Sequence, residues 1–423
     1  MGGLSKRSYQ INTLTDKNSP APILLDAGNL LFKQPTVTRS QELLTAAGLM
    51  EIYQQMVYDA VAVGPYDLAA GVEFLKNGLA KGFPWLSANL MDKHHKPIFP
   101  AVRIITRDNI KIGIIGLTGQ ITAASQEIVV TDWREVLPEQ LKQLAEDCQL
   151  VIALSNLSGE DNAELTRNFP QVHVLFTAEK HQGNVVPKVA NNTLVTQTIN
   201  QGKYLGILDL DWIPGISWGK NQELEGPTAS EQDSSQPPSR FSGNFIALTK
   251  NLPEDQQIAA HLEEIKQQIN LYNQKLAASA NNPQSPANNH FSLGLAGSAR
   301  CRECHPLQTA FWNSTKHAQA YATLQRQRQN INLDCLPCHI TKNSFPATAD
   351  SAPVESLLTL PATLLSVGCE TCHGARLAHA ESPDQVQLTG KVDEKVCIGC
   401  HTMERDPAFD YRQKSPLVSC PTK

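Results

Sequence analysis

The sequence lacks several features that would assign it to common functional classes. It has no run of about 18 to 20 apolar residues, the length that a membrane span needs, so no segment is expected to cross a membrane. The formal net charge is only −5 over 423 residues, which gives no basic face for nucleic acid. Apolar residues make up 41% of the chain, enough to build cores, and the length predicts two domains plus connecting material.

Cysteine is nearly absent from the first 300 residues and concentrated after them. Eight of the ten cysteines lie in four Cys-x-x-Cys-His patterns, at residues 301–305, 335–339, 369–373 and 397–401, and only Cys148 and Cys420 lie outside them. This spacing is typical of c-type haem attachment through two thioethers. Structural zinc sites and disulfides also use paired cysteines, but neither requires a histidine directly after the second one. We therefore expect four covalently attached haem c groups, each held by one pair of cysteines: Cys301 and Cys304, Cys335 and Cys338, Cys369 and Cys372, Cys397 and Cys400.

The histidines of this segment decide the chemistry of the irons. The proximal iron ligands are expected to be the histidines that end the patterns: His305, His339, His373 and His401. Two protein ligands give an electron carrier, whereas an open position binds a small molecule. Three further histidines lie nearby, His290, His317 and His379, and the dense packing of haem sites favours ligation by them. Three spare histidines for four irons leave one iron open, ligated by Met403, or served by a more distant histidine such as His261.

The residues around the first and third patterns carry a family resemblance. Trp312, Thr315 and His317-Ala318 follow the first pattern, and a Gly-Cys-Glu-Thr-Cys-His-Gly run forms the third. Over residues 296–412 the chain resembles the tetrahaem cytochrome c-554 family of electron carriers, with Thr315 where that family has serine. The resemblance implies closely packed, mostly bis-histidine haems with His317 and His379 as distal ligands, and one iron that can be five-coordinate. The family's late histidine beyond the fourth site is absent here.

The first two hundred residues alternate apolar runs typical of strands with amphipathic helical ones, which predicts an α/β layered fold. Strands are expected at residues 22–25, 111–117, 150–154, 172–176, 193–198 and 204–210. Helices are expected at residues 41–55, 68–81 and 135–148.

Short motifs in this half occur in a familiar order. They include Leu24 to Asn29, Gly64 to Gly71, Asn89, and Ser155-Asn156. Across residues 2–212 the chain resembles the calcineurin-like metallophosphoesterases, specifically their 5′-nucleotidase branch. That resemblance implies a four-layer α/β sandwich, with two mixed sheets between helices, and a two-metal hydrolysis of phosphoesters.

The metal ligands of that family are mostly replaced in this chain. Asn29 stands where the resemblance implies the bridging aspartate, Tyr66-Asp67 where it implies His-Glu, and Asn156 where it implies a histidine. The loss of charge and of donors predicts a fold kept without its hydrolysis. The alternative is a rewired single-metal site at Asp26, Asp67, Glu179 and His181.

Composition divides the chain into four parts. Residues 1–215 form the metallophosphoesterase-like domain, residues 216–250 a polar linker, residues 251–280 a connecting helix, and residues 286–423 a mostly α-helical or irregular tetrahaem domain. The helix carries apolar residues at steps of three and four. Packing on its own chain is the expected role of that stripe, and a homodimer through residues 253–278 is the alternative.

These features predict a multihaem electron-transfer protein of the periplasm or the cell surface, with the first domain as a docking or scaffold module. Its expected partners are redox proteins; a small redox-active molecule is a second candidate. A haem enzyme for a small nitrogen or sulfur compound and a redox-coupled phosphoesterase are the alternatives, and no catalytic residue is assigned. Because c-type haem is attached outside the bacterial cytoplasm, while no signal-like run and no opening Asp-x-His motif precede Gly2, we also expect N-terminal residues beyond those given.

Overall fold

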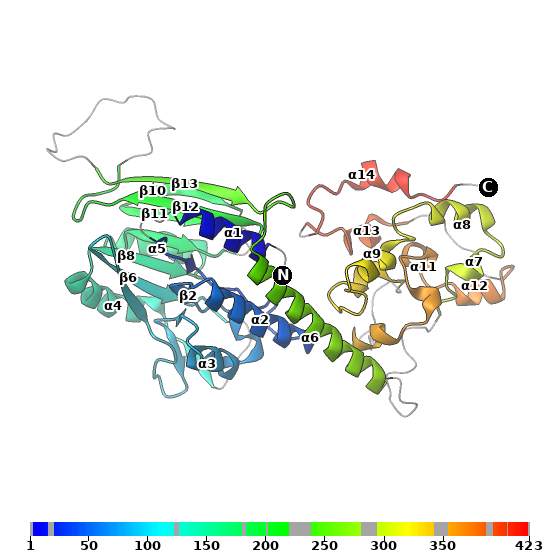
Figure 1. The fold of residues 1–423 in the computed structure, drawn as a ribbon, viewed down its shortest axis with the longest axis horizontal. Coiled ribbons are helices and arrows are strands. Elements are labelled where there is room, and N and C mark those ends of the chain that lie inside the picture. The colour runs from blue at the N-terminus through cyan, green and yellow to red at the C-terminus, as the bar shows by residue number, and fades with distance from the viewer. Residues whose placement is uncertain are drawn as a thin grey trace, which may run out of the picture. The chain divides into compact units, whose positions relative to one another are not determined.

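The computed structural model describes residues 3–15, 21–121, 127–179, 183–199, 202–219, 238–280, 294–341, 354–385, 392–403 and 405–421. It divides into two compact units, Met1–Glu264 and Ile265–Lys423 (Figure 1). No helix in these described ranges is both long and apolar enough to cross a membrane.

A six-stranded mixed sheet forms the centre of the first unit, in the order β10-β11-β9-β8-β6-β5. Its inner strands β6, β8, β9 and β11 run parallel to one another, while β5 and β10 are antiparallel edges. Every residue of β8 is buried, as expected for the centre of a sheet covered on both faces. The strands are β5 (Val102–Arg107), β6 (Ile110–Leu117), β8 (Leu150–Ser155), β9 (Val174–Thr177), β10 (Val185–Ala190) and β11 (Thr193–Gln197).

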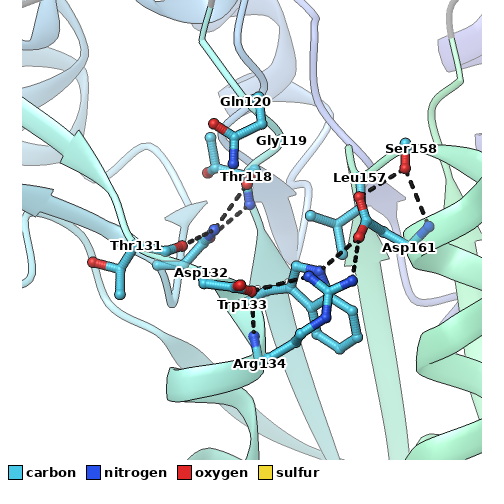
Figure 2. A pocket seen from close by; sticks show the side chains of 11 residues that line it. Thr118, Gly119, Gln120, Thr131, Asp132, Trp133, Arg134, Leu157, Ser158 and Asp161 are labelled. Atoms are coloured by element: carbon cyan, nitrogen blue, oxygen red, sulfur yellow. Dashed lines mark hydrogen bonds and ion pairs between the residues drawn. The ribbon is translucent and has the colours of Figure 1, made fainter.

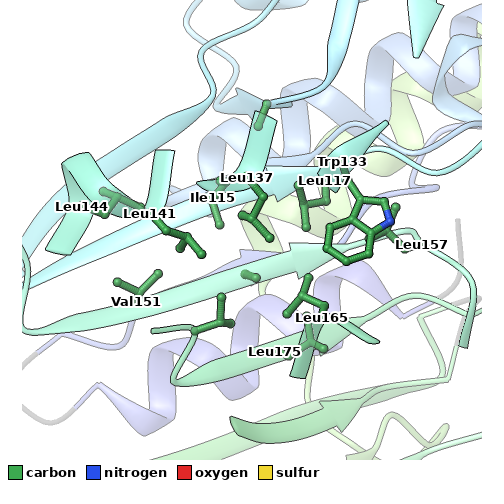
Figure 3. Packing of buried hydrophobic residues seen from close by; sticks show 13 residues of the cluster. Ile115, Leu117, Trp133, Leu137, Leu141, Leu144, Val151, Leu157, Leu165 and Leu175 are labelled. Atoms are coloured by element: carbon green, nitrogen blue, oxygen red, sulfur yellow. The ribbon is translucent and has the colours of Figure 1, made fainter. Parts of the chain in front are cut away.

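Helices α4 (Trp133–Asp147) and α5 (Gly159–Asn168) cover one face of this sheet. In α4 the apolar residues Leu137, Leu141 and Leu144 recur one helical turn apart, so they share one face. Figure 3 shows this face packed on Ile115 and Val151 of the sheet. The sequence placed this helix at residues 135–148; it begins two residues earlier, after the cap at Asp132, whose side chain accepts from the Arg134 backbone N–H.

A second, three-stranded parallel sheet, β1-β2-β3, lies against the other face, where β2 and β3 contact β6. Its strands are β1 (Leu25–Asp26), β2 (Ala60–Ala62) and β3 (Trp85–Leu86). The remaining elements are α1 (Leu4–Leu14), α2 (Gln41–Gln55), the 3₁₀ turn η1 (Asp67–Ala70), α3 (Val72–Ala80) and the strand pair β4 (Leu90–Asp92) and β7 (Ile128–Val130). The helix predicted at residues 68–81 is broken at Gly71, whose φ of +83° lies outside the helical region.

The stretch predicted as a linker, residues 216–250, differs from that expectation. Strand β13 (Arg240–Ala247) pairs along its whole length with β12 (Tyr204–Asp211). Trp218, 6% exposed, joins the core beside Trp212 and Phe241. A polar, proline-rich sequence precedes β13, which is why the strand was predicted as linker. Residues 220–237 lie outside the described residues.

Helix α6 (Gln256–Ala280) contains the division between the two units. Its apolar stripe is buried within the chain: Ile258 and Leu262 belong to the first unit, Ile265 and Ile269 to the second, and each is at most 7% exposed. Packing on its own chain was the expected role of this stripe. The alternative homodimer receives no support, because these side chains are not left for a second copy.

The second unit consists of short helices joined by irregular segments (Figure 1). Its apolar cluster is small: Leu324, Leu333, Leu336, Ile340 and Leu357. This matches the expected helical and irregular character. The helical elements are α7 (Ser298–Cys301), α8 (Pro306–Asn313), α9 (Ala320–Arg326), α10 (Leu336–His339), η3 (Val354–Thr359), η4 (Ala362–Leu364), α11 (Cys369–His373), α12 (Leu377–Glu381), α13 (Glu394–Ile398), α14 (Tyr411–Lys414) and η5 (Ser415–Leu417).

Candidate functional site

Each Cys-x-x-Cys-His pattern folds as a helical turn. In the first and fourth, the backbone N–H of His305 and of His401 donates to the carbonyl of the first cysteine, at 2.9 Å in both. The second and third patterns lie on α10 and α11. Residues three apart share one face of such a turn, so the two thiols of each pattern are presented together with the histidine next to them.

Two pairs of histidines face each other in the second unit. The ring centres of His305 and His379 are 6.4 Å apart, and those of His317 and His401 are 6.2 Å apart. Two imidazoles that bind one metal ion from opposite sides at about 2.1 Å each have ring centres roughly 6 Å apart. Burial lowers the pKa of His317, with a further contribution from nearby His401, which favours the neutral imidazole that metals bind.

The other two proximal candidates have different surroundings. His339 Nδ1 lies 2.8 Å from the Ala320 carbonyl oxygen, which leaves Nε2 to face a ligand. Burial lowers the pKa of His373, with Arg376 and His305 adding to the effect. Among the described residues, no second imidazole ring stacks against either histidine, and His290 lies outside those residues.

The sequence suggested two alternative iron ligands, His261 and Met403. The ring of His261 contacts Glu51 Oε2 at 3.1 Å and Gln55 Nε2 at 2.8 Å within the first unit. Met403 follows the fourth pattern but is 78% exposed. Neither position resembles that of the paired histidines.

Two side chains that contact His401, Asp406 and Phe409, were not predicted from the sequence as part of the site. His401 Nδ1 is 2.8 Å from Asp406 Oδ2, and its ring stacks on Phe409 with centres 4.5 Å apart and planes 17° apart. A histidine that binds a metal ordinarily donates its other ring N–H to such an outer partner, which fixes the tautomer. An acidic residue in the turn just after a Cys-x-x-Cys-His pattern was the available sequence signal.

Sites one and three are joined by a buried carboxylate. Glu370, 1% exposed, accepts backbone N–H groups from Ala296 at 2.8 Å, Gly297 at 2.7 Å and Arg376 at 2.9 Å. It lies inside the third pattern, while Ala296 and Gly297 lead into the first. The indole of Trp312 makes a second link by donating to the Val367 carbonyl at 2.9 Å.

The thiols confirm that these sites are close. A hydrogen bond between Cys301 and Cys369 lowers the pKa of Cys369 to about 6 and raises that of Cys301. Burial raises the pKa of Cys372 to about 11, with Cys397 of the fourth site and Cys420 nearby. Sites one, three and four are therefore neighbours.

The donor set and the interior of this unit suit haem. Two buried polar atoms beside the third site, Arg376 Nε and Thr371 Oγ1, have no hydrogen-bond partner within the described chain. A guanidinium is the usual partner of a carboxylate such as a haem propionate. The residues present thus fit a covalently bound haem.

A hydrogen-bonded amide pair lies in the first unit at the positions where the sequence resemblance implied metal ligands. Asn29 Nδ2 donates to Asn156 Oδ1 at 2.7 Å, Asn156 in turn donates to the Ala27 carbonyl, and Asn29 Oδ1 accepts from the Tyr66 N–H at 2.9 Å. The two side-chain amides are therefore hydrogen-bonded to each other and to backbone groups.

The nearby carboxylates also have protein partners. Asp67, fully buried, accepts from the N–H groups of Asn29, Leu31 and Gly64, each at 2.8 Å, and desolvation raises its pKa to about 7. Asp26 accepts from the Tyr53 hydroxyl at 2.9 Å and the Gly28 N–H. The described chain contains no group of three or more His, Cys, Asp or Glu side chains that could hold a metal, and His181 lies outside it.

A polar cavity of about 150 Å³ opens at the carboxyl ends of β6 and β8. Figure 2 shows Arg134 reaching across it toward Asp132 and Asp161. The guanidinium bonds to both and to Glu164, at 3.1, 2.7 and 2.5 Å. These charges are mutually satisfied, so the cavity shows no group aimed at a ligand.

Comparisons with known proteins match the N-terminal and the C-terminal parts of the chain to different families. The family described as cytochrome c554 and c-prime matches residues 300–374. A 5′-nucleotidase of Vibrio cholerae is 28% identical over 197 residues, 37% of this chain and 36% of the relative. A snake venom 5′-nucleotidase of Gloydius brevicauda is 26% identical over 309 residues, 64% of this chain and 47% of the relative. The chain thus spans less than half the length of these curated relatives.

A solved structure shows the same fold for the first part. The sulfate thiohydrolase SoxB of Thermus thermophilus, in complex with glycerol, superposes with a TM-score of 0.51 at 18% identity, over 62% of this chain and 46% of that one. At this identity the likeness concerns the fold alone. The N-terminal part therefore resembles the calcineurin-like phosphoesterases of the 5′-nucleotidase group, and the C-terminal part resembles the cytochrome c554 family.

Proposed function

We propose that this chain is a multihaem c-type cytochrome that transfers electrons in the periplasm or at the cell surface. The observation that carries the proposal is the approach of two pairs of histidine rings, His305 to His379 with centres 6.4 Å apart and His317 to His401 with centres 6.2 Å apart. The match to the cytochrome c554 family supports haem c as the cofactor, and the four repeated patterns support a number of four.

The chain's own residues hold each cofactor in a defined way. Cys301 and Cys304 form the thioethers of the first site, and the corresponding cysteines do so at the other three. His305 and His379 would hold the haem of the first site, and His401 and His317 would hold that of the fourth. His339 and His373 are the proximal ligands of the second and third sites, and His290 is the candidate distal ligand for one of them. When bound, haem supplies an iron that alternates between ferric and ferrous states.

The contacts between sites define an electron path. Glu370 ties the third site to the first, and α11 packs against α13 of the fourth. These short links keep the sites adjacent, so that electrons pass between neighbours without a mobile carrier. Redox proteins are the proposed partners, because the chain itself supplies no electron source.

The first domain is proposed to act as a docking or scaffold module without hydrolysis. Its support is the direct contact between Asn29 and Asn156, which puts amides on each other where metallophosphoesterases carry metal ligands. The packing of β2 and β3 on β6 supports the four-layer sandwich expected for this fold.

Visible spectroscopy tests the proposed ligation. The protein is matured in a host that attaches c-type haem, and spectra are recorded oxidised, reduced, and reduced with carbon monoxide. Sharp low-spin bands are expected for the bis-histidine sites. A carbon monoxide response in about one haem of four would indicate an open iron and direct attention to a small redox-active molecule. A response of all four would contradict the proposed histidine pairs.

A further inference from the structure

The loop after the fourth site holds a carboxylate against its proximal histidine. Asp406 Oδ2 lies 2.8 Å from His401 Nδ1. The turn that follows the pattern fixes the carboxylate, because the Asp406 N–H donates to the Thr402 carbonyl at 2.8 Å and the Phe409 N–H donates to the Asp406 carbonyl at 3.0 Å. The same turn stacks Phe409 on the His401 ring, so the orientation of the imidazole is set from two sides.

The second site provides an internal comparison. There, His339 Nδ1 lies 2.8 Å from the Ala320 carbonyl oxygen, the same distance as in the fourth site. The two hydrogen bonds therefore differ in the charge of the acceptor: a neutral carbonyl in one case and a carboxylate in the other.

The charge of that acceptor changes the ligand. A carboxylate draws the Nδ1 proton toward itself, so the imidazole becomes more basic and donates more electron density to a bound metal. Greater donation stabilises the ferric state over the ferrous state, which lowers the reduction potential. Asp406 is 42% exposed, so solvent screens part of its charge, whereas the direct hydrogen bond at 2.8 Å keeps the local effect.

We propose that Asp406 is a positioning residue that lowers the reduction potential of the fourth haem site through His401 and sets it below that of the second site. The inference rests on the proposed function, since it requires haem at residues 397–401. It assigns the fourth site as less favoured than the second to hold an electron when the chain is partly reduced.

The test is spectropotentiometric titration of the haem-loaded full chain carrying Asp406→Asn. This substitution keeps the size of the side chain and an oxygen that can accept from Nδ1 but removes the charge. One haem component of the four is expected to move to a more positive potential while the other three stay in place. Asp406→Glu, which keeps the charge, is expected to restore a low potential, and Asp406→Ser, a second neutral replacement, to move the same component in the same direction.

The matched control is Asp410→Asn. This substitution removes the same charge only four residues from Asp406. The Asp410 carboxylate accepts from the Gln413 N–H at 3.2 Å and does not contact His401. Its titration curve is expected to coincide with that of the unaltered chain. Equal shifts in Asp406→Asn and Asp410→Asn would show a general charge effect and overturn the proposal.

Haem content, measured before each titration, separates this inference from the function on which it rests. An unaltered chain without covalent haem would overturn both. Four haems in Asp406→Asn and Asp406→Ser with titration curves that superimpose on the parent curve would overturn the role of Asp406 and leave the cytochrome intact.

Discussion

Glu370 is a buried, hydrogen-bonded carboxylate in the second unit. Its carboxylate is 1% exposed and receives three backbone N–H groups from two separate segments. The sequence identified Glu370 only as part of a family-like run, because Ala296 and Gly297, which donate to it, lie 74 and 73 residues away along the chain. Contacts of this kind depend on the tertiary fold and leave no local pattern.

Loss of this carboxylate should destabilise the second unit. In Glu370→Ala, one buried and two part-buried N–H groups lose their acceptor, and a buried unsatisfied group costs about 1–3 kcal/mol. We expect a clear fall in the unfolding temperature of the haem-loaded protein, followed by circular dichroism, and a smaller fall for Glu370→Gln, which keeps one oxygen. Glu381→Ala, at the exposed end of α12, is the control, and an equal effect of both alanine variants would contradict this role.

Asp67 predicts a pH dependence for the first unit. Desolvation raises its folded-state pKa from 3.8 to about 7, so between these two values the folded state binds a proton that the unfolded state has released. The free energy of unfolding therefore falls as pH rises from about 4 to about 7, by up to about 4 kcal/mol for a shift of this size. Burial raises the pKa of Asp26 as well, which adds in the same direction.

The measurement is urea denaturation followed by tryptophan fluorescence at a series of pH values. Unaltered protein should show a lower midpoint at pH 7 than at pH 5, and Asp67→Asn should flatten this slope because it removes the titrating group. Stability that rises over the same interval would show that the three backbone hydrogen bonds outweigh desolvation at Asp67.

At the scale of elements, periodic and buried segments were predicted well and edge segments were not. Helix α2 has the predicted bounds, and strands β6 and β8 differ by a residue, since long apolar periodicity specifies them. Strands β5 and β10 were missed because edge strands alternate with exposed residues and carry a weaker signal. Strand β13 was missed because it follows a polar stretch and depends on β12 for its pairing.

Helix α6 offers an element-scale prediction in the second unit. Ile269 is 2% exposed, and replacement by alanine should cost about 2–5 kcal/mol through lost burial and a cavity. Leu271, two residues away on the same helix and 57% exposed, is the matched control, for which Leu271→Ala should change stability by less than about 0.5 kcal/mol. Denaturation midpoints of the two variants check this, and a similar loss in both would mean that the apolar stripe is not what anchors the helix.

At the scale of the whole molecule, one chain combines a part that resembles 5′-nucleotidases with a part that resembles the cytochrome c554 family. The second unit contains the four Cys-x-x-Cys-His patterns, whereas the first has a fold like that of the phosphoesterases, with Asn29 and Asn156 in direct contact. The proposed cofactor type followed from local spacing alone. The pairing of histidines did not, because His379 lies 74 residues beyond His305 and only the fold brings them together.

Metal removal tests the role of the first domain. The Asn29–Asn156 contact predicts that a chelator leaves the unfolding temperature of this domain unchanged and that added manganese or zinc produces no phosphoester hydrolysis. The same assays on Asn29→Asp control for the position, because this variant reintroduces a carboxylate there. A chelator-sensitive melting transition in the unaltered chain would instead favour a metal held by Asp26, Asp67, Glu179 and His181.

The central claim is that the four cysteine pairs carry covalent haem. Intact-mass spectrometry of the protein matured with c-type haem machinery, under denaturing conditions that strip non-covalent groups, measures this directly. The account predicts a mass increase equal to four haem groups, falling by one group in a Cys369→Ala, Cys372→Ala double variant. A chain of unmodified mass, with zinc released on denaturation, would contradict it.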